Sequence, residues 1–173
     1  MGEMMLRRNM MLGVAALALA ACGRAQARIG ADGLPEATIF RITPADAQVI
    51  PFRMLESVNA LRSANGAAPL SLDAQLNAAA ATHSRDMAVQ NRPWHFGSDG
   101  SSPLDRLARV GFTGTLVGET ISESFEDDIT TLAAWMEQPA TRNVILDRNA
   151  NRMGIAWFQE DGGKIWWTMV LAR

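Results

Sequence analysis

Two apolar segments near the C-terminus, separated by Glu160-Asp161-Gly162-Gly163, constrain the fold of this chain more than any other feature. The segments, MGIAWFQ (153–159) and KIWWTMVLA (164–172), are rich in aromatic and β-branched residues, which favour strands. Acidic and glycine residues between two such segments are typical of a hairpin turn. A sheet built on this hairpin must bury its apolar faces, so we expect the preceding segments to supply helices that cover it.

The preceding segments show helical periodicity. A helix is predicted from about Ala45, with an inner face formed by Phe52, Leu55, Val58 (or Asn59) and Leu61. A second has Ser71 or Asp73 as N-cap, and its inner face carries Leu72, Leu76, Ala79, Ala80, His83 and Met87. A short helix should run from Ser102-Pro103 to Val110, followed by a strand within 111–124. A further helix opening at 124–128 should turn these residues inward: Ile129, Leu132, Ala133, Trp135 and Met136. This order predicts an α/β (α+β) fold, an α-β-α sandwich with a small antiparallel sheet flanked by helices.

The first 22 residues differ from the remainder. Arg7 and Arg8 precede an apolar run that ends at Ala21, and the sole cysteine, Cys22, follows. The run is shorter than the ~20 residues that cross a bilayer as a helix, and it is typical of a secretory signal peptide. Leu19-Ala20-Ala21-Cys22 resembles the lipobox of bacterial lipoproteins, which implies cleavage before Cys22 and lipid on its thiol.

The predicted organisation is a signal peptide at 1–21, a tether at 22–45 and a folded domain at 46–173. We expect an exported protein, lipid-anchored in the cell envelope, by either the Sec or the twin-arginine route. In a Gram-negative host, Gly23 after the lipid site favours the outer membrane, facing the periplasm. The membrane is then a partner through the lipid on Cys22.

Composition and motifs exclude several functions. A net charge of −2 over 173 residues is not that of a nucleic-acid-binding domain. The chain has no Gly-x-Ser-x-Gly elbow and no glycine-rich phosphate loop. The acidic run Glu123, Glu126, Asp127 and Asp128 is interpreted as charge that stabilises a helix N-terminus, with calcium binding as the alternative.

Five segments together carry a family resemblance: LRSANGAAPLSLDAQLNAAAATHSRDMA, HFGSDGSSPLDRLARVGF, GETI, WMEQPATRNVIL and MGIAW. In this order they resemble the bacterial branch of the CAP superfamily, or SCP-like domains, from about Leu55 to Arg173. The resemblance implies an α-β-α sandwich. It also implies a cleft in which two histidines and acidic residues can hold a divalent cation, often zinc.

The resemblance implies roles for particular residues. His95 matches the first family histidine and Glu119, in GETI, the first glutamate. Thr141 stands where the second histidine is expected, and Glu137 is a candidate second acid, offset by one residue. Because a threonine hydroxyl is a poor zinc ligand at neutral pH, no firm cofactor is predicted. A weak zinc site built on His95 and Glu119, with Glu137, is the alternative.

Two interpretations of the histidines follow. His83 lies on the inner face of a helix and is expected to hydrogen-bond within the core rather than to replace the missing ligand. His95 is expected to meet Glu119, either fixing the loop or acting as a ligand or acid-base group.

The favoured function is a non-catalytic binding module. Its cleft, formed by Trp94, His95, Glu119 and Thr141, is expected to receive a lipid, a glycan or another envelope ligand. One alternative is a hydrolase with Glu119 or Glu137 as general base, and His95 polarising water or holding a metal. The other is a scaffold that contacts envelope proteins through a vestigial cleft.

Overall fold

The computed structural model describes residues 39–173. The predicted signal peptide, Cys22 and most of the predicted tether lie outside this part of the chain. The elements are, in order, α1 (Pro44–Ala64), β1 (Ser71–Leu72), α2 (Ala74–Gln90), α3 (Pro103–Arg109), β2 (Leu116–Ser124), α4 (Asp128–Glu137), α5 (Pro139–Ile145), β3 (Arg152–Gln159) and β4 (Ile165–Ala172). None of the helices between residues 39 and 173 is both long and apolar enough to span a membrane.

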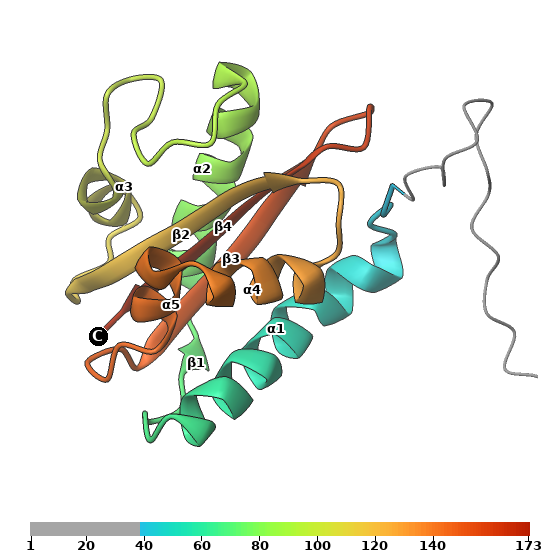
Figure 1. Cartoon of the computed structure of the whole chain (residues 1–173). Coiled ribbons are helices and arrows are strands. Elements are labelled where there is room, and N and C mark those ends of the chain that lie inside the picture. The colour runs from blue at the N-terminus through green and yellow to red at the C-terminus, as the bar shows by residue number, and fades with distance from the viewer. Residues whose placement is uncertain (1–38) are drawn as a thin grey trace, which may run out of the picture. The chain divides into compact units, whose positions relative to one another are not determined.

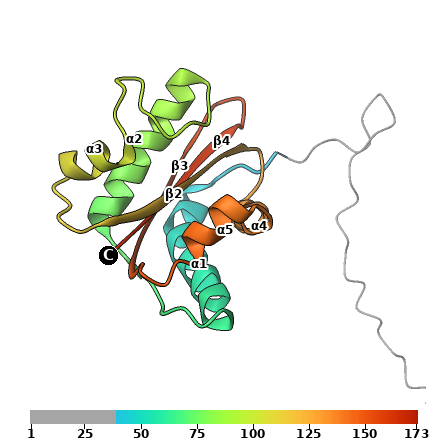
Figure 2. The same ribbon diagram turned by 60° about the vertical axis from the view of Figure 1, so that its left-hand side comes forward.

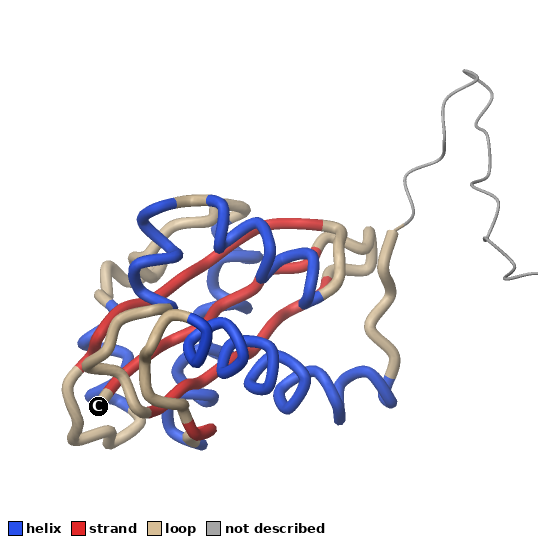
Figure 3. The backbone as a smooth tube through the Cα atoms, turned by 60° about the horizontal axis from the view of Figure 1, so that its bottom comes forward, coloured by secondary structure: helices blue, strands red, loops and turns tan. Residues whose placement is uncertain are grey.

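A four-stranded sheet of order β1-β3-β4-β2 forms the middle layer. Helices α2 and α3 lie on one face, and α1, α4 and α5 lie on the other (Figures 1 and 2). The long strands β2, β4 and β3 run side by side through the domain (Figure 3). The predicted α+β sandwich and C-terminal hairpin are confirmed. The sheet is mixed rather than purely antiparallel, because the short β1 pairs in parallel with β3.

Each face of the sheet has its own core. The face covered by α1, α4 and α5 buries large side chains such as Trp135, Trp167 and Met169. The face covered by α2 and α3 buries smaller ones, among them Leu76, Ala79 and Val170. Small residues let α2 approach the sheet closely: a Cβ at Gly154 would stand 2.3 Å from the backbone of Leu76.

Side-chain caps define where the helices begin. Thr43 and Ser102 each form a capping box with an aspartate three residues later, at the starts of α1 and α3. Asp73, one of two predicted candidates, caps α2, and its carboxylate accepts from the amides of Gln75 and Leu76. Leu72 therefore lies in β1 and not in the helix.

The predicted inner face of α1 was wrong at Phe52, which is 66% exposed. The fully buried stripe is Ile50, Met54, Val58 and Arg62. Val58 was predicted correctly, and Leu55 and Leu61 are half-buried against the same core. Arg62 belongs to this stripe because its guanidinium binds backbone carbonyls inside the protein. A pattern of apolar residues omits a buried arginine. The predicted inner face was therefore rotated about the helix axis relative to the observed one.

The inner face of α4 was predicted in part: Leu132 and Trp135 are buried as expected, whereas Ile129 and Ala133 are exposed. Its buried residues are Asp128, Thr131, Leu132 and Trp135, and Asp128 is buried because Arg53 pairs with it. Helix α5 was not predicted. It begins at Pro139, immediately after the single residue Gln138 that separates it from α4.

Candidate functional site

Glu119 lies at the centre of the site and projects from β2 toward α2 and α3. It is paired across the sheet with Val170, whose side chain belongs to the core on that face. The preceding Gly118 faces the other layer, where a Cβ would stand 2.7 Å from the side chain of Val144 on α5. The Gly-Glu pair thus lets α5 pack against one face while the carboxylate enters the other. The Glu119 side chain is only 2% exposed.

Arg106 of α3 neutralises this buried carboxylate. Its Nη2 donates to both oxygens of Glu119, at 2.8 and 2.7 Å. Its Nη1 donates to the backbone carbonyls of His95 and Ser101, at 3.0 and 3.2 Å. One guanidinium therefore joins the 95–101 loop, α3 and the central sheet.

His95 meets Glu119, as predicted. Its Nδ1 donates to Oε1 of the carboxylate at 2.9 Å, and its side chain is 51% exposed. In the neutral ring the proton is on Nδ1, so Nε2 is a free acceptor; in the described part of the chain it has no hydrogen-bond partner. Burial alone would raise the pKa of Glu119, but the hydrogen bond from His95 and the charge of Arg106 outweigh it and lower that pKa.

His83 is buried on α2, as predicted, but it is also part of this cluster. Its Nε2 is 2.9 Å from the carbonyl oxygen of Trp94 and 3.7 Å from Oε1 of Glu119. Because a carbonyl can only accept, Nε2 carries the proton. Burial lowers the pKa of His83 further than the nearby Glu119 raises it, so the ring is neutral at pH 7.

The lowered pKa of His83 predicts a pH dependence of stability. Its folded-state pKa lies below the value of about 6.5 in the unfolded chain, so the unfolded chain binds the proton first as the pH falls. The free energy of unfolding should therefore decrease below pH 6.5, by at most about 1.4 kcal/mol per pH unit. Carboxyl groups with lowered pKa values, such as Glu119, change the free energy of unfolding only at more acidic pH, below about 4.5.

Urea unfolding at pH 7.5, 6.5 and 5.5 measures this effect, with His83→Gln as the comparison. Equal slopes in the two proteins would contradict the assignment to His83.

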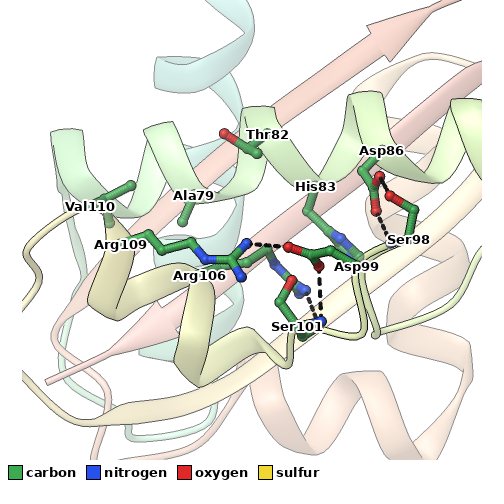
Figure 4. Close-up of a pocket in the computed structure, with 10 residues that line it drawn as sticks. All are labelled: Ala79, Thr82, His83, Asp86, Ser98, Asp99, Ser101, Arg106, Arg109 and Val110. Carbon is green, nitrogen blue, oxygen red and sulfur yellow. Dashed lines mark hydrogen bonds and ion pairs between the residues drawn. The ribbon is translucent and has the colours of Figure 1, made fainter.

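A pocket of about 170 Å³ lies between α2 and α3, behind the 97–101 loop (Figure 4). The loop is fastened on both sides. Ser98 donates through its amide and hydroxyl to Asp86 on α2, and Arg109 on α3 donates to Asp99 at 2.6 Å. His83 and Arg106 line this pocket, whereas the cleft residues predicted from the sequence do not. Sequence reasoning missed Arg106, the residue that links the pocket to Glu119.

The other predicted residues, Trp94, Thr141 and Glu137, make no hydrogen bond or ion pair with Glu119 within residues 39–173. Trp94 is half-buried, with the guanidinium of Arg92 over its ring at 3.7 Å and Phe96 edge-on at 5.4 Å. Thr141 lies at the start of α5 and donates to the backbone carbonyls of Trp135 and Gln138. Glu137 is exposed at the end of α4 and makes no ion pair within residues 39–173.

The residues at the site do not fit the divalent cation that the family resemblance implies. Both oxygens of Glu119 already accept from Arg106, and a positive guanidinium beside them repels a second cation. Thr141 lies on α5, which packs against the face of the sheet opposite to the Glu119 side chain, and its hydroxyl is a poor zinc ligand. In the described part of the chain, no group of three or more histidine, cysteine, aspartate or glutamate residues is placed to hold a metal ion.

Fold and site together define an α-β-α domain whose central glutamate is held by histidine and arginine. Residues 55–171 match the CAP family, the cysteine-rich secretory protein family. The chain is 28% identical to the Bacillus subtilis protein YkwD over 123 residues, covering 71% of this chain and 47% of YkwD. It thus spans about half the length of that curated relative.

Solved structures with the same fold include an outer surface protein of Borrelia burgdorferi, with 13% identity and a TM-score of 0.68 over 74% of this chain and 95% of that one. An SCP-domain extracellular protein of Bacillus anthracis has 22% identity and a TM-score of 0.68, over 78% of this chain and 45% of that one. The chain belongs to the CAP family.

Proposed function

We propose that the protein is an exported CAP-domain binding module, anchored in the cell envelope by lipid on Cys22. The binding role is inferred from the hydrogen bonds that the Glu119 carboxylate already accepts. Its two oxygens accept from Arg106 and one also accepts from His95, so no carboxylate oxygen at the centre is free to act as general base. The ion pair instead holds the 95–101 loop in one conformation. A rigid loop that presents exposed side chains is suited to recognition.

The binding surface is the outer face of this loop, formed by Trp94, His95 and Phe96. Phe96 is 47% exposed, and the His95 Nε2 beside it accepts a hydrogen bond from a ligand hydroxyl or amide. An apolar ring beside one fixed acceptor suits an amphiphilic envelope molecule, a lipid or a glycan. Similar proteins described as an outer surface protein and an extracellular protein support export.

Binding of two probes tests this proposal: a lysophospholipid and purified peptidoglycan fragments, titrated while tryptophan fluorescence is recorded. His95→Ala with Phe96→Ala is expected to weaken the binding of one probe at least tenfold, about 1.4 kcal/mol. Val89→Ala, which removes an exposed apolar side chain on another face of α2, is the matched control. Equal affinity in all three proteins, or no binding of either probe, would contradict the proposal.

A hydrolase is the second candidate, and the geometry of His95 favours it. A histidine that donates through Nδ1 to a buried carboxylate and presents Nε2 outward has the arrangement of a general base. Within residues 39–173, however, no serine, threonine or cysteine side chain is hydrogen-bonded to His95, so the base would have to activate water. Turnover of a peptide or ester library that is abolished by His95→Gln would establish this function.

A further inference from the structure

Exposed apolar side chains gather at the end of the domain where the chain enters. Of the eight large apolar residues exposed in the described part of the chain, five lie at this end: Ile39 at 41%, Val49 at 47%, Phe52 at 66%, Phe125 at 44% and Ile129 at 40%. We call these five residues the entry-end group. They come from three places: residues 39–43, which precede α1 and are called the entering segment; the first half of α1; and the β2–α4 connection with the first turn of α4 (Figure 1).

Two contacts bring these segments together. The amide of Phe40 donates to the carbonyl of Phe125 at 2.9 Å, so the entering segment lies against the β2–α4 connection. Arg53, next to Phe52, binds Asp128, next to Ile129, which joins α1 to α4. Residues distant in the sequence thus meet at one end.

We propose that the entry-end group is a membrane-docking surface, through which the domain contacts the lipid bilayer that holds its anchor. This inference rests on the proposed lipid anchor. Sixteen residues, 23–38, separate Cys22 from Ile39, and a chain of that length spans at most about 60 Å. The end that carries Ile39 is the one nearest the anchor along the chain, which favours its contact with the lipid over that of more distant surfaces.

The charges around the entry-end group select the type of lipid surface. The carboxylates of Asp46, Glu126 and Asp127 lie at this end of α1 and α4. The opposing charges are Arg41 on the entering segment and Arg53, whose charge is offset by its ion pair with the buried Asp128. An acidic rim is repelled by anionic headgroups, so the surface fits a zwitterionic lipid, with the apolar side chains at the headgroup boundary.

The sole cysteine permits a test that does not depend on lipidation in the cell. The chain from Cys22 onward, which contains the whole described fold, is coupled through its thiol to a maleimide lipid in phosphatidylcholine vesicles. Amide hydrogen exchange then compares coupled and free protein. We expect exchange in peptides covering 48–54 and 124–130 to slow about threefold or more on the vesicle, and exchange around Val89 and Leu104 to stay unchanged.

Val49→Ser with Phe52→Ser should abolish the protection, and both positions are exposed enough to leave the fold intact. Val89→Ser with Leu104→Ser, two exposed apolar residues at other surfaces, should leave it unchanged. Adding phosphatidylglycerol should weaken the protection.

Three results would overturn the docking proposal: equal exchange in coupled and free protein, protection around Val89 and Leu104 instead, or the same protection in concentrated protein without vesicles, which would indicate a second copy. The mass of Cys22 peptides from cells tests the anchor separately. An unmodified thiol would remove the anchor while leaving the docking result interpretable.

Discussion

Replacing Arg106 by methionine should lower the free energy of unfolding by about 3–5 kcal/mol, because it leaves the Glu119 carboxylate buried without its cation. The same change also removes donors to the backbone carbonyls of His95 and Ser101, so the loop should loosen with it. Urea unfolding at pH 7 measures the loss. Amide exchange in the 95–102 segment reports the loop.

Two variants separate charge burial from simple loss of packing. Arg106→Met combined with Glu119→Gln should recover part of the loss, since a neutral amide costs less to bury than an unpaired carboxylate. Arg109→Met removes an exposed, solvent-screened pair with Asp99 and should change the free energy of unfolding far less than Arg106→Met does. A stability of Arg106→Met within 1 kcal/mol of the parent protein would refute the central role of this ion pair.

Replacing Arg62 by methionine should destabilise the protein by about 4 kcal/mol. Its fully buried guanidinium donates to the backbone carbonyls of Ala68, Ile145, Asp147 and Ala150, at 2.8 to 3.0 Å. Methionine fills similar space but leaves these carbonyls without that donor. The same side chain therefore ties the end of α1 to the α1–β1 and α5–β3 connections.

Thermal and urea unfolding of Arg62→Met measure this effect. Arg148→Met is the matched control, because Arg148 is exposed and donates to the carbonyl of Asn65 at 3.3 Å. The control should change stability by less than about 1 kcal/mol. Similar losses in the two variants would show that the buried carbonyl bonds contribute little.

The elements with simple apolar periodicity were predictable from the sequence. The stripe of α2, with Leu76, His83 and Met87, and both arms of the hairpin lie where their patterns place them. Prediction failed where a charged residue is buried against a distant partner. Arg62 on α1 and Asp128 on α4 read as surface residues, yet each belongs to the inner face of its helix.

The candidate site was predictable to a similar extent. The family resemblance brought His95 and Glu119 together, and their hydrogen bond is present. Arg106 was missed because its partner Glu119 lies thirteen residues later, outside any local pattern. One signal was available: Arg106 stands beside Leu107 on the inward face of a short, well-capped helix. His83 was placed in the core correctly, but its approach to Glu119 depends on the packing of α2 on the sheet.

The central claim is that the ion pair with Arg106 prevents the Glu119 carboxylate from binding a metal ion. Calorimetric titration of zinc into the metal-stripped protein tests this claim most directly. With both carboxylate oxygens held by the guanidinium, we expect no binding tighter than about 100 µM. His95→Ala should then give the same baseline as the parent protein. Micromolar binding by the parent protein, lost in His95→Ala, would contradict the account and place a metal at the site.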